Sequence, residues 1–288
     1  MSRSRLRLLQ WVPFVSALLW VGLPTAKADV IDNVLAGMEA QSPIDIRSDN
    51  TYFGRLSPLQ FNLSSDTNLS VINNGAPAVD KTIRANVVPG AGSVTLDGDT
   101  YKLAQFHFHT PSEHLQNSKA TPLEMHLVFA DASHKVLVVG RWVNEGSFNS
   151  SLGPIFNDLP KTVTDTHSVN DFNLNSLLPD NRESFRYTGS LTTPPFTEGV
   201  KWVNFEHPLE MSKSQIQAFQ TLFPEGDARP VQPLNGRIIL TDVPGFVSAV
   251  PEPETYAMLL AGLGLIGFIV VRRSKGSMVG KEFMGSVA

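Results

Sequence analysis

Two short segments in which polar and apolar residues alternate constrain this chain most. They are residues 105–109 (Gln-Phe-His-Phe-His) and residues 123–129 (Leu-Glu-Met-His-Leu-Val-Phe). Residues two apart in an extended strand point to the same face. His107 and His109 therefore share one face of a strand, and the phenylalanines beside them face the core. If the two strands pair antiparallel, His126 of the second strand joins the two histidines of the first.

Three imidazoles that converge in this way can hold one metal ion. Two histidines on a strand are by themselves more often a plain polar face, but His126 is a third one and acceptors accompany it. Metal-bound imidazoles usually donate their second N–H to an acceptor, and Gln105 and Glu124 each precede a histidine by two residues. Three nitrogen ligands with one open position are typical of catalytic zinc. We therefore expect His107, His109 and His126 to bind Zn²⁺.

Four further motifs follow the same order as in a known family. They are residues 41–46 (Gln-Ser-Pro-Ile-Asp-Ile), 111–114 (Pro-Ser-Glu-His), 189–195 (Gly-Ser-Leu-Thr-Thr-Pro-Pro) and 229–235 (Arg-Pro-Val-Gln-Pro-Leu-Asn). With the histidine segments, they resemble the α-class carbonic anhydrases over residues 37–241. The resemblance implies a mostly β (α+β) single domain on a central, largely antiparallel twisted sheet with short peripheral helices. It also implies reversible hydration of carbon dioxide to bicarbonate and a proton by zinc-bound hydroxide.

The local pattern agrees with a β-rich fold. Helical signals are few: residues 29–39, and a stretch from Ser212, a suitable N-cap, to about residue 223. Glycine, proline and asparagine separate short strand-like runs. We expect strands at residues 93–96, 103–108, 124–129, 135–142, 184–189 and 200–206.

The resemblance also assigns roles around the metal. Thr192 would accept a hydrogen bond from the hydroxide and pass its own proton to Glu113, although a threonine beside two prolines is by itself more often a turn residue. Asp227, where the family usually has asparagine, would offer its backbone carbonyl to His109. Thr193 would contact bicarbonate. The family's apolar wall for carbon dioxide corresponds to Val128, Val138, Leu191, Val200 and Trp202, which by composition alone are simply core residues.

Two departures from the family pattern bear on the rate. Ala76 stands where fast members have a proton-shuttle histidine, so we expect no histidine shuttle. The aromatic segment that normally precedes Gln41 is missing. The chain also has no cysteine, so the fold depends on its core alone, without the disulfides that an exported protein can use.

Two other functions compete with catalysis. One is a catalytically weak or inactive carbonic-anhydrase-like binding module at the cell surface, although family members of that kind characteristically lose a zinc histidine. The other is a periplasmic zinc store, which would need the ligands but neither Thr192 nor Glu113. All of these residues are present in the sequence, which favours the enzyme.

Residues 1–28 have the pattern of a signal peptide. Arg3, Arg5 and Arg7 precede an apolar run at residues 11–23, and residues 26–28 (Ala-Lys-Ala) form a cleavage site. The pattern predicts export to the periplasm, the cell envelope or the exterior.

The other end, residues 250–273, resembles a PEP-CTERM sorting signal. A Pro-Glu-Pro stretch precedes sixteen uncharged residues and then Arg272 and Arg273. As a helix, sixteen residues span about 24 Å, and flanking arginines extend the reach across a ~30 Å hydrocarbon core. We expect a transmembrane helix that an exosortase processes, the alternative being a plain membrane anchor. Residues 274–288 would be a cytoplasmic-side tail of unknown role.

Between these ends, residues 29–249 provide one domain's worth of chain. Residues 29–250 contain 15 Lys or Arg and 24 Asp or Glu, a balance of −9, and no basic block stands out. This argues against nucleic acid as a partner. The expected partners are carbon dioxide and bicarbonate, the processing exosortase, and the membrane through the C-terminal helix.

Overall fold

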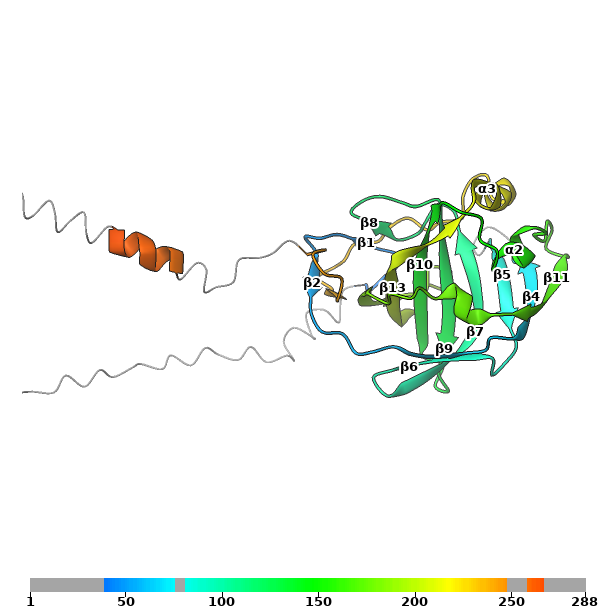
Figure 1. The fold of residues 1–288 in the computed structure, drawn as a ribbon, viewed down its shortest axis with the longest axis horizontal. Coiled ribbons are helices and arrows are strands. Elements are labelled where there is room, and N and C mark those ends of the chain that lie inside the picture. The colour runs from blue at the N-terminus through cyan, green and yellow to red at the C-terminus, as the bar shows by residue number, and fades with distance from the viewer. Residues whose placement is uncertain (1–38, 76–80, 248–257, 267–288) are drawn as a thin grey trace, which may run out of the picture. The chain divides into compact units, whose positions relative to one another are not determined.

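The computed structural model describes residues 39–75, 81–247 and 258–266 of the chain (Figure 1). Several predictions fall outside these residues. They are the signal peptide at residues 1–28, all but the last residue of the helix expected at residues 29–39, the shuttle position Ala76, residues 250–257 and 267–273 of the sorting segment, and the tail at residues 274–288.

One large sheet dominates the described residues. Its main path has the order β11-β4-β5-β7-β9-β10-β13-β12-β14-β2, and β6 and β3 extend from β7 to complete 12 strands. Within it, only β10–β13 and β14–β2 pair in parallel. The mostly β, largely antiparallel fold is therefore confirmed. The strands are β2 (Thr51–Phe53), β3 (Gln60–Leu63), β4 (Thr67–Asn73), β5 (Ile83–Val87), β6 (Gly92–Leu96), β7 (Asp99–His109), β9 (Leu123–Ala130), β10 (Val136–Glu145), β11 (Thr166–Phe172), β12 (Ser184–Ser190), β13 (Glu198–Met211) and β14 (Ile239–Thr241).

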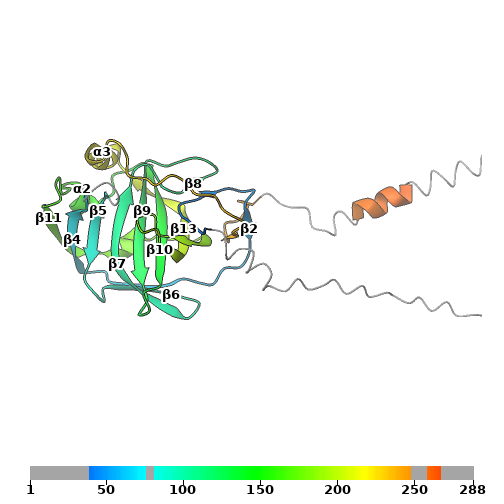
Figure 2. The same ribbon diagram turned by 180° about the vertical axis from the view of Figure 1, so that it is seen from behind.

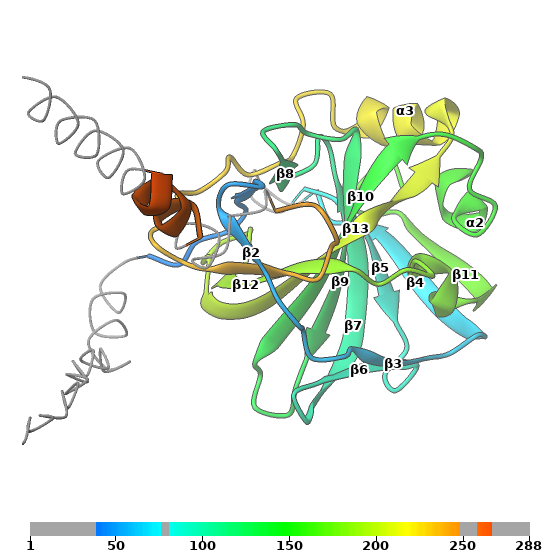
Figure 3. The ribbon, with the colours of Figure 1, turned by 60° about the vertical axis from the view of Figure 1, so that its left-hand side comes forward.

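Short elements surround this sheet. Figures 1 and 2 show β7, β9 and β10 side by side in its middle, with α2 (Gly153–Phe156) and α3 (Lys213–Leu222) at its margin. β1 (Asp45–Ile46) and β8 (Leu115–Gln116) form a separate parallel pair, and Leu174–Leu177 is a 3₁₀ turn. Turned by 60°, the molecule shows β2 and β12 at the other end (Figure 3).

Two helices were expected in the C-terminal part of the chain. The one that follows Ser212 is confirmed, and the transmembrane helix stays a prediction. Helix α3 begins after Ser212, whose side chain accepts a hydrogen bond from the backbone of Gln215 while the Gln215 side chain accepts one from the Ser212 backbone. This capping box explains why the helix starts there. Residues 258–266 are also helical. Among the helices of the described residues, none has the length and apolar character needed to cross a membrane.

A bulge in β7 sets which side chains reach the functional face. Leu103 is paired with Phe129, but Gln105 is already paired with Val128, so one extra residue lies between them. Such a bulge shifts the alternation by one residue and re-aims the side chains that follow. Leu103 is therefore buried in the core on one side of the bulge, and Phe106 is buried in the same core beyond it. The odd-numbered residues from 105 onward face the opposite side.

Candidate metal centre

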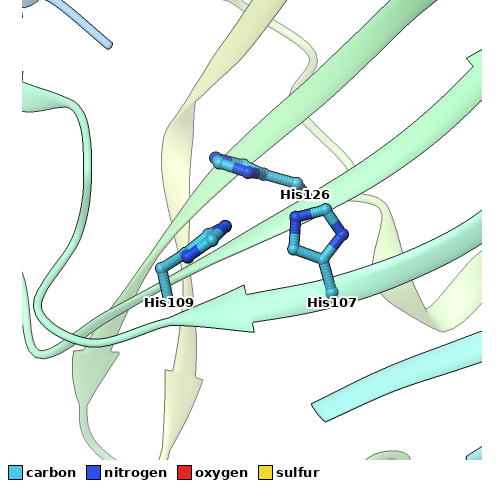
Figure 4. A group of neighbouring side chains, drawn as sticks. All are labelled: His107, His109 and His126. Atoms are coloured by element: carbon cyan, nitrogen blue, oxygen red, sulfur yellow. The ribbon is translucent and has the colours of Figure 1, made fainter. Parts of the chain in front are cut away.

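The three predicted ligands lie together on two neighbouring strands. His107 and His109 are on β7, and His126 on β9 is directly paired with His107 across the antiparallel ladder. Their ring centroids are 4.9 to 5.3 Å apart. Figure 4 shows the three rings facing a common point. One ring nitrogen from each lies within 4.8 Å of the others, a spacing that suits a shared ion. The predicted convergence is thus present.

The two predicted acceptors contact the outer nitrogens of the rings. The Nδ1 of His107 is 2.8 Å from the Oε1 of Gln105, so Nε2 is the nitrogen left for a metal. The Nε2 of His126 is 2.9 Å from the Oε1 of Glu124, which leaves Nδ1. Gly140, opposite His126 on β10, makes room for this carboxylate, since a Cβ there would lie 3.1 Å from Oε1. Such contacts fix ring orientation.

The acceptor that faces His109 differs from the expected one. The predicted contact was the backbone carbonyl of Asp227, but the structure places the side-chain Oδ2 of Asp227 3.5 Å from His109 Nδ1. The other oxygen, Oδ1, accepts a hydrogen bond of 2.6 Å from the backbone N–H of Thr110. An aspartate has a second oxygen free to turn toward the ring once the first is held, whereas an asparagine would present its amide there. This substitution therefore puts a carboxylate beside the ligand.

Neighbouring imidazoles and neighbouring carboxylates shift the pKa values of these histidines in opposite directions. Burial lowers the pKa of His107 well below its usual value, and neighbouring His109 and His126 lower it further. Burial alone would also lower the pKa of His109, but the charges of Glu113 and Asp227 outweigh it and raise this pKa to about 9. Burial would raise the pKa of Glu124, but the adjacent histidines hold it well below its usual range. The chain thus surrounds the imidazoles with negative charge that a cation would balance.

Glu113 and Thr192 lie beside the triad. The Oε1 of Glu113 accepts a hydrogen bond of 2.9 Å from the backbone N–H of Arg229. Its Oε2 lies 3.5 Å from His109 Nε2 and has no hydrogen-bond partner among the described residues. Thr192 lines the same cavity. The hydrogen bond from Thr192 to Glu113 remains a prediction, because the described contacts do not include it.

Two cavities open beside the histidines. The first, of about 220 Å³, contains two carboxylates, and we call it the acidic cavity. The second, of about 290 Å³, has mostly apolar walls, and we call it the apolar cavity. The acidic cavity is lined by Lys81, His109, Glu113, Thr192, Thr193, Pro194, Phe196, Gly226, Asp227, Ala228 and Arg229. The apolar cavity is lined by Thr82, Arg84, Gln105, His107, His126, Val128, Val136, Val138, Leu191, Thr192, Thr193 and Trp202.

Most of the predicted substrate wall lines the apolar cavity. Val128, Val138, Leu191 and Trp202 do so, and Thr193 borders both cavities. Val200 is the exception: it is buried in the adjacent core cluster and is not part of the lining. Val200 lies two residues before Trp202 on β13 and so shares its face, but it is outside the cavity lining.

Two cations that line the cavities, Lys81 and Arg84, and one buried residue that contacts His114, Tyr187, were not predicted from the sequence. Lys81 and Arg84 line the acidic and apolar cavities respectively. Lys81 lies in the connection between β4 and β5, and Arg84 is on β5, where it pairs with His107. His114 is fully buried, with Nδ1 2.8 Å from Glu124 and Nε2 2.6 Å from the hydroxyl of Tyr187. Tyr187 had not been singled out.

Comparison with known proteins agrees with the fold and the site. A family model described as "Eukaryotic-type carbonic anhydrase" matches residues 31–243. The chain belongs to this family. The carbonic anhydrase of Pectobacterium carotovorum is 39% identical over 69% of this chain and 79% of its own length, and that of Neisseria gonorrhoeae is 35% identical over 69% and 76%.

A solved structure has the same architecture. The α-carbonic anhydrase of Thermovibrio ammonificans, determined with the inhibitor sulfanilamide, superposes with a TM-score of 0.65 at 39% identity. The match covers 70% of this chain and 86% of that one. A second family model, the PEP-CTERM protein-sorting motif, matches residues 249–274. The predicted sorting signal at residues 250–273 is therefore confirmed, and it implies export and sorting to the cell envelope.

Proposed function

We propose that the protein catalyses the reversible hydration of carbon dioxide to bicarbonate and a proton, with Zn²⁺ held by His107, His109 and His126. The observation that carries this proposal is the trio of imidazoles on β7 and β9, whose inner nitrogens lie within 4.8 Å of one another. Relatives named carbonic anhydrase that cover most of the domain support it.

The residues present fit zinc. All three inner donors are imidazole nitrogens, the ligand set of a catalytic site that keeps one position open. The inner nitrogen of His109, Nε2, is buried and has no hydrogen-bond partner among the described residues. Three carboxylates nearby, those of Glu113, Glu124 and Asp227, supply charge for a divalent ion to balance. When bound, Zn²⁺ is a Lewis acid that lowers the pKa of a coordinated water to about 7, a value known for carbonic anhydrases in general.

Glu113 and Thr192 would orient the attacking oxygen. Glu113 is held by the backbone N–H of Arg229 and keeps Oε2 free on the cavity side. This oxygen is suited to accept the hydroxyl proton of Thr192, which fixes the direction of the Thr192 lone pairs. Thr192 then accepts a hydrogen bond from the attacking oxygen and points the remaining electron pair of that oxygen toward the substrate.

The apolar cavity would bind carbon dioxide. Val128, Val138 and Trp202 form a wall without hydrogen-bonding demand, since the indole N–H of Trp202 already donates to the backbone carbonyl of Ser190 at 2.9 Å. An apolar substrate replaces water on this wall at no cost in polar contacts. Thr193 borders both cavities and is placed to contact the bicarbonate that forms.

One experiment tests this function. The purified chain is assayed for bound metal, and carbon dioxide hydration is followed by stopped flow with an indicator. We expect one zinc per chain and hydration above the uncatalysed rate that is lost on chelation and restored by zinc. A zinc-loaded chain without hydration would favour the surface binding module or the zinc store instead.

For the sorting signal, we propose processing by an exosortase-type enzyme after export. The PEP-CTERM match at residues 249–274 supports this step. Intact masses of the protein from envelope and medium fractions should show an N-terminus at Asp29 and a cut near residues 251–253. A full-length product in the cytoplasm would contradict the proposal.

A further inference from the structure

A single guanidinium lies in the apolar cavity without a counter-ion. Arg84 is on β5, where it pairs across the ladder with His107. The lining of the apolar cavity includes Arg84 and, among the described residues, no carboxylate. Arg84 Nε is buried and has no hydrogen-bond partner within the described part of the chain. An arginine donor that is buried without an acceptor is unfavourable unless a ligand supplies one.

The surroundings of Arg84 favour an anion with two oxygens. The Nε–H and one Nη–H of a guanidinium form a planar fork that matches a carboxylate side on. Val128, Val136 and Val138 line the same cavity, and an apolar lining lowers the local dielectric and so strengthens the electrostatic attraction. A planar anion of four heavy atoms is much smaller than the cavity volume of about 290 Å³. Because the domain carries a balance of −9, attraction of an anion to this point must come from a local cation.

The neighbours of Arg84 cannot take its place as charged donors to such a ligand. The hydroxyl of Thr82, on the same face of the chain, is bonded to the backbone carbonyl of Phe108. The Oε1 of Gln105 accepts from His107, which leaves the amide N–H groups of Gln105 as donors without charge. Arg84 is therefore the charged donor that the described structure offers on this side of the histidines.

We propose that Arg84 forms an anion subsite in the apolar cavity, beside the metal position and separate from it, that binds a carboxylate-type anion through its guanidinium fork. Two sources share this chemistry: bicarbonate, the reaction product, and short carboxylates from the surroundings. The bicarbonate source rests on the proposed function, whereas binding of a carboxylate does not. The subsite would hold the anion after it leaves the reacting position and before it leaves the protein.

The test is a binding titration on the full chain, zinc-loaded and after zinc removal. The probe is acetate, with bicarbonate as a second arm and chloride at matched ionic strength as a third. Binding is followed by the indole N–H resonance of Trp202, which lines the apolar cavity and is present in every variant. Arg84→Gln removes the fork. Arg47→Gln is the matched control, because Arg47 is paired with Asp49 at 2.8 Å on the surface.

We expect saturable acetate binding with and without zinc, weaker binding of chloride, and at least a tenfold higher Kd in Arg84→Gln with no change in Arg47→Gln. Bicarbonate should behave as acetate does. An unchanged Kd in Arg84→Gln, or acetate binding that disappears when zinc is removed, would overturn the subsite, because the anion would then bind only to the metal.

A second variant keeps the test decisive if Arg84→Gln does not fold. Arg84→Lys retains the charge but loses the fork, so acetate should bind several-fold more weakly while chloride binds as before. An acetate Kd in Arg84→Lys equal to that of the unaltered chain would also overturn the proposal, because the fork would then contribute nothing. Hydration and zinc content are measured on the same samples. A chain that binds acetate through Arg84 but does not hydrate carbon dioxide would refute the proposed function and leave the subsite standing.

Discussion

The two cavities beside the histidines differ in the charges they contain. The acidic cavity has the carboxylates of Glu113 and Asp227 beside His109, together with the cations Lys81 and Arg229. The apolar cavity has valines and Trp202 and, as its one formal charge among the described residues, Arg84. In the proposed function, the carboxylates that hold protons would lie in the acidic cavity, and the apolar cavity would take the apolar substrate and its anionic product. The comparison shows that strands β7 and β9 position the three histidines, whereas the loops and strand β5 supply the charged residues around them.

The largest expected effect comes from removing one of the three histidines beside which both cavities open. His109→Ala should lower zinc affinity by more than the ~10- to 100-fold that is typical of losing an outer partner, and should abolish hydration. The physical reason is that the remaining two imidazoles leave the ion with too few ligands. Metal analysis after dialysis measures the change, with His134→Ala, on an exposed turn, as the control. Near-native zinc and activity in His109→Ala would exclude this residue as a ligand.

The second-largest expected effect comes from a variant that disturbs the orientation of the attacking oxygen but keeps the metal. Thr192→Ala should keep zinc but reduce the hydration rate by about 100-fold, because misplacement of a reacting group by about 1 Å has an effect of this size. Thr193→Ala is the matched neighbour and should have a smaller effect. Unchanged hydration in zinc-replete Thr192→Ala would show that Thr192 does not orient the attacking oxygen and is only a turn residue.

A third prediction concerns the carboxylate of the acidic cavity that faces His109. Asp227→Asn should weaken zinc binding by about tenfold, because the outer partner of a ligand raises its basicity. Competition binding with a chelator at pH 9 measures this effect. Equal affinity of the two proteins at this pH would show that the side chain has no influence on the ligand.

Asp227→Asn also tests how zinc affinity depends on pH. The pKa of His109 is about 9 in the metal-free chain, so this imidazole is protonated at pH 7 and zinc must displace the proton. Zinc affinity should therefore fall as the pH decreases below 9, by about tenfold per pH unit for one proton. Asp227 is one of the charges that raise this pKa, so Asp227→Asn should move the onset of the fall to lower pH. An onset that stays in place would assign the shift to Glu113 instead.

The sequence predicted the metal position because strand periodicity determines it. Alternation in residues 105–109 and 123–129 was enough to put His107, His109 and His126 on one face, and the antiparallel register brings them together. The family resemblance supplied Thr192 and Glu113. The bulge between Leu103 and Gln105 could not be predicted, since it depends on how β7 is paired with β9 rather than on β7 alone.

The surroundings of the metal position were less predictable. Alternation predicts that a side chain faces away from the core, but it does not predict whether that side chain meets solvent or lines a cavity. Arg84 reads as an ordinary strand residue until β5 is paired beside His107. The carboxylate of Asp227 was expected to be irrelevant because a backbone contact was expected. A side-chain contact depends on the rotamer, which the hydrogen bond from Thr110 fixes.

The smallest expected effect concerns proton release on the acidic side. Asn73 pairs with Ile83, and the backbone N–H of Asn74 donates to the carbonyl of Thr82 at 2.7 Å. The hairpin therefore returns to the acidic cavity at Lys81, which lines it beside His109 and Glu113. Within the described residues, Lys81 is thus the residue of this connection that lines the acidic cavity, whereas the sequence alone had pointed to Ala76, which lies outside the described residues.

A side chain at this point matters because each turnover leaves a proton that must reach the solvent. Histidines titrate near neutral pH and suit this transfer. Lys81→His should therefore raise the maximal hydration rate several-fold in dilute buffer and flatten its dependence on imidazole-type buffer, with kcat/KM unchanged. Lys81→Gln controls for loss of the charge, and Ala76→His tests the position expected from the sequence. If Ala76→His alone accelerates turnover, the exit lies in the loop before Lys81; if the wild-type rate is already high and independent of buffer, protons leave by another group.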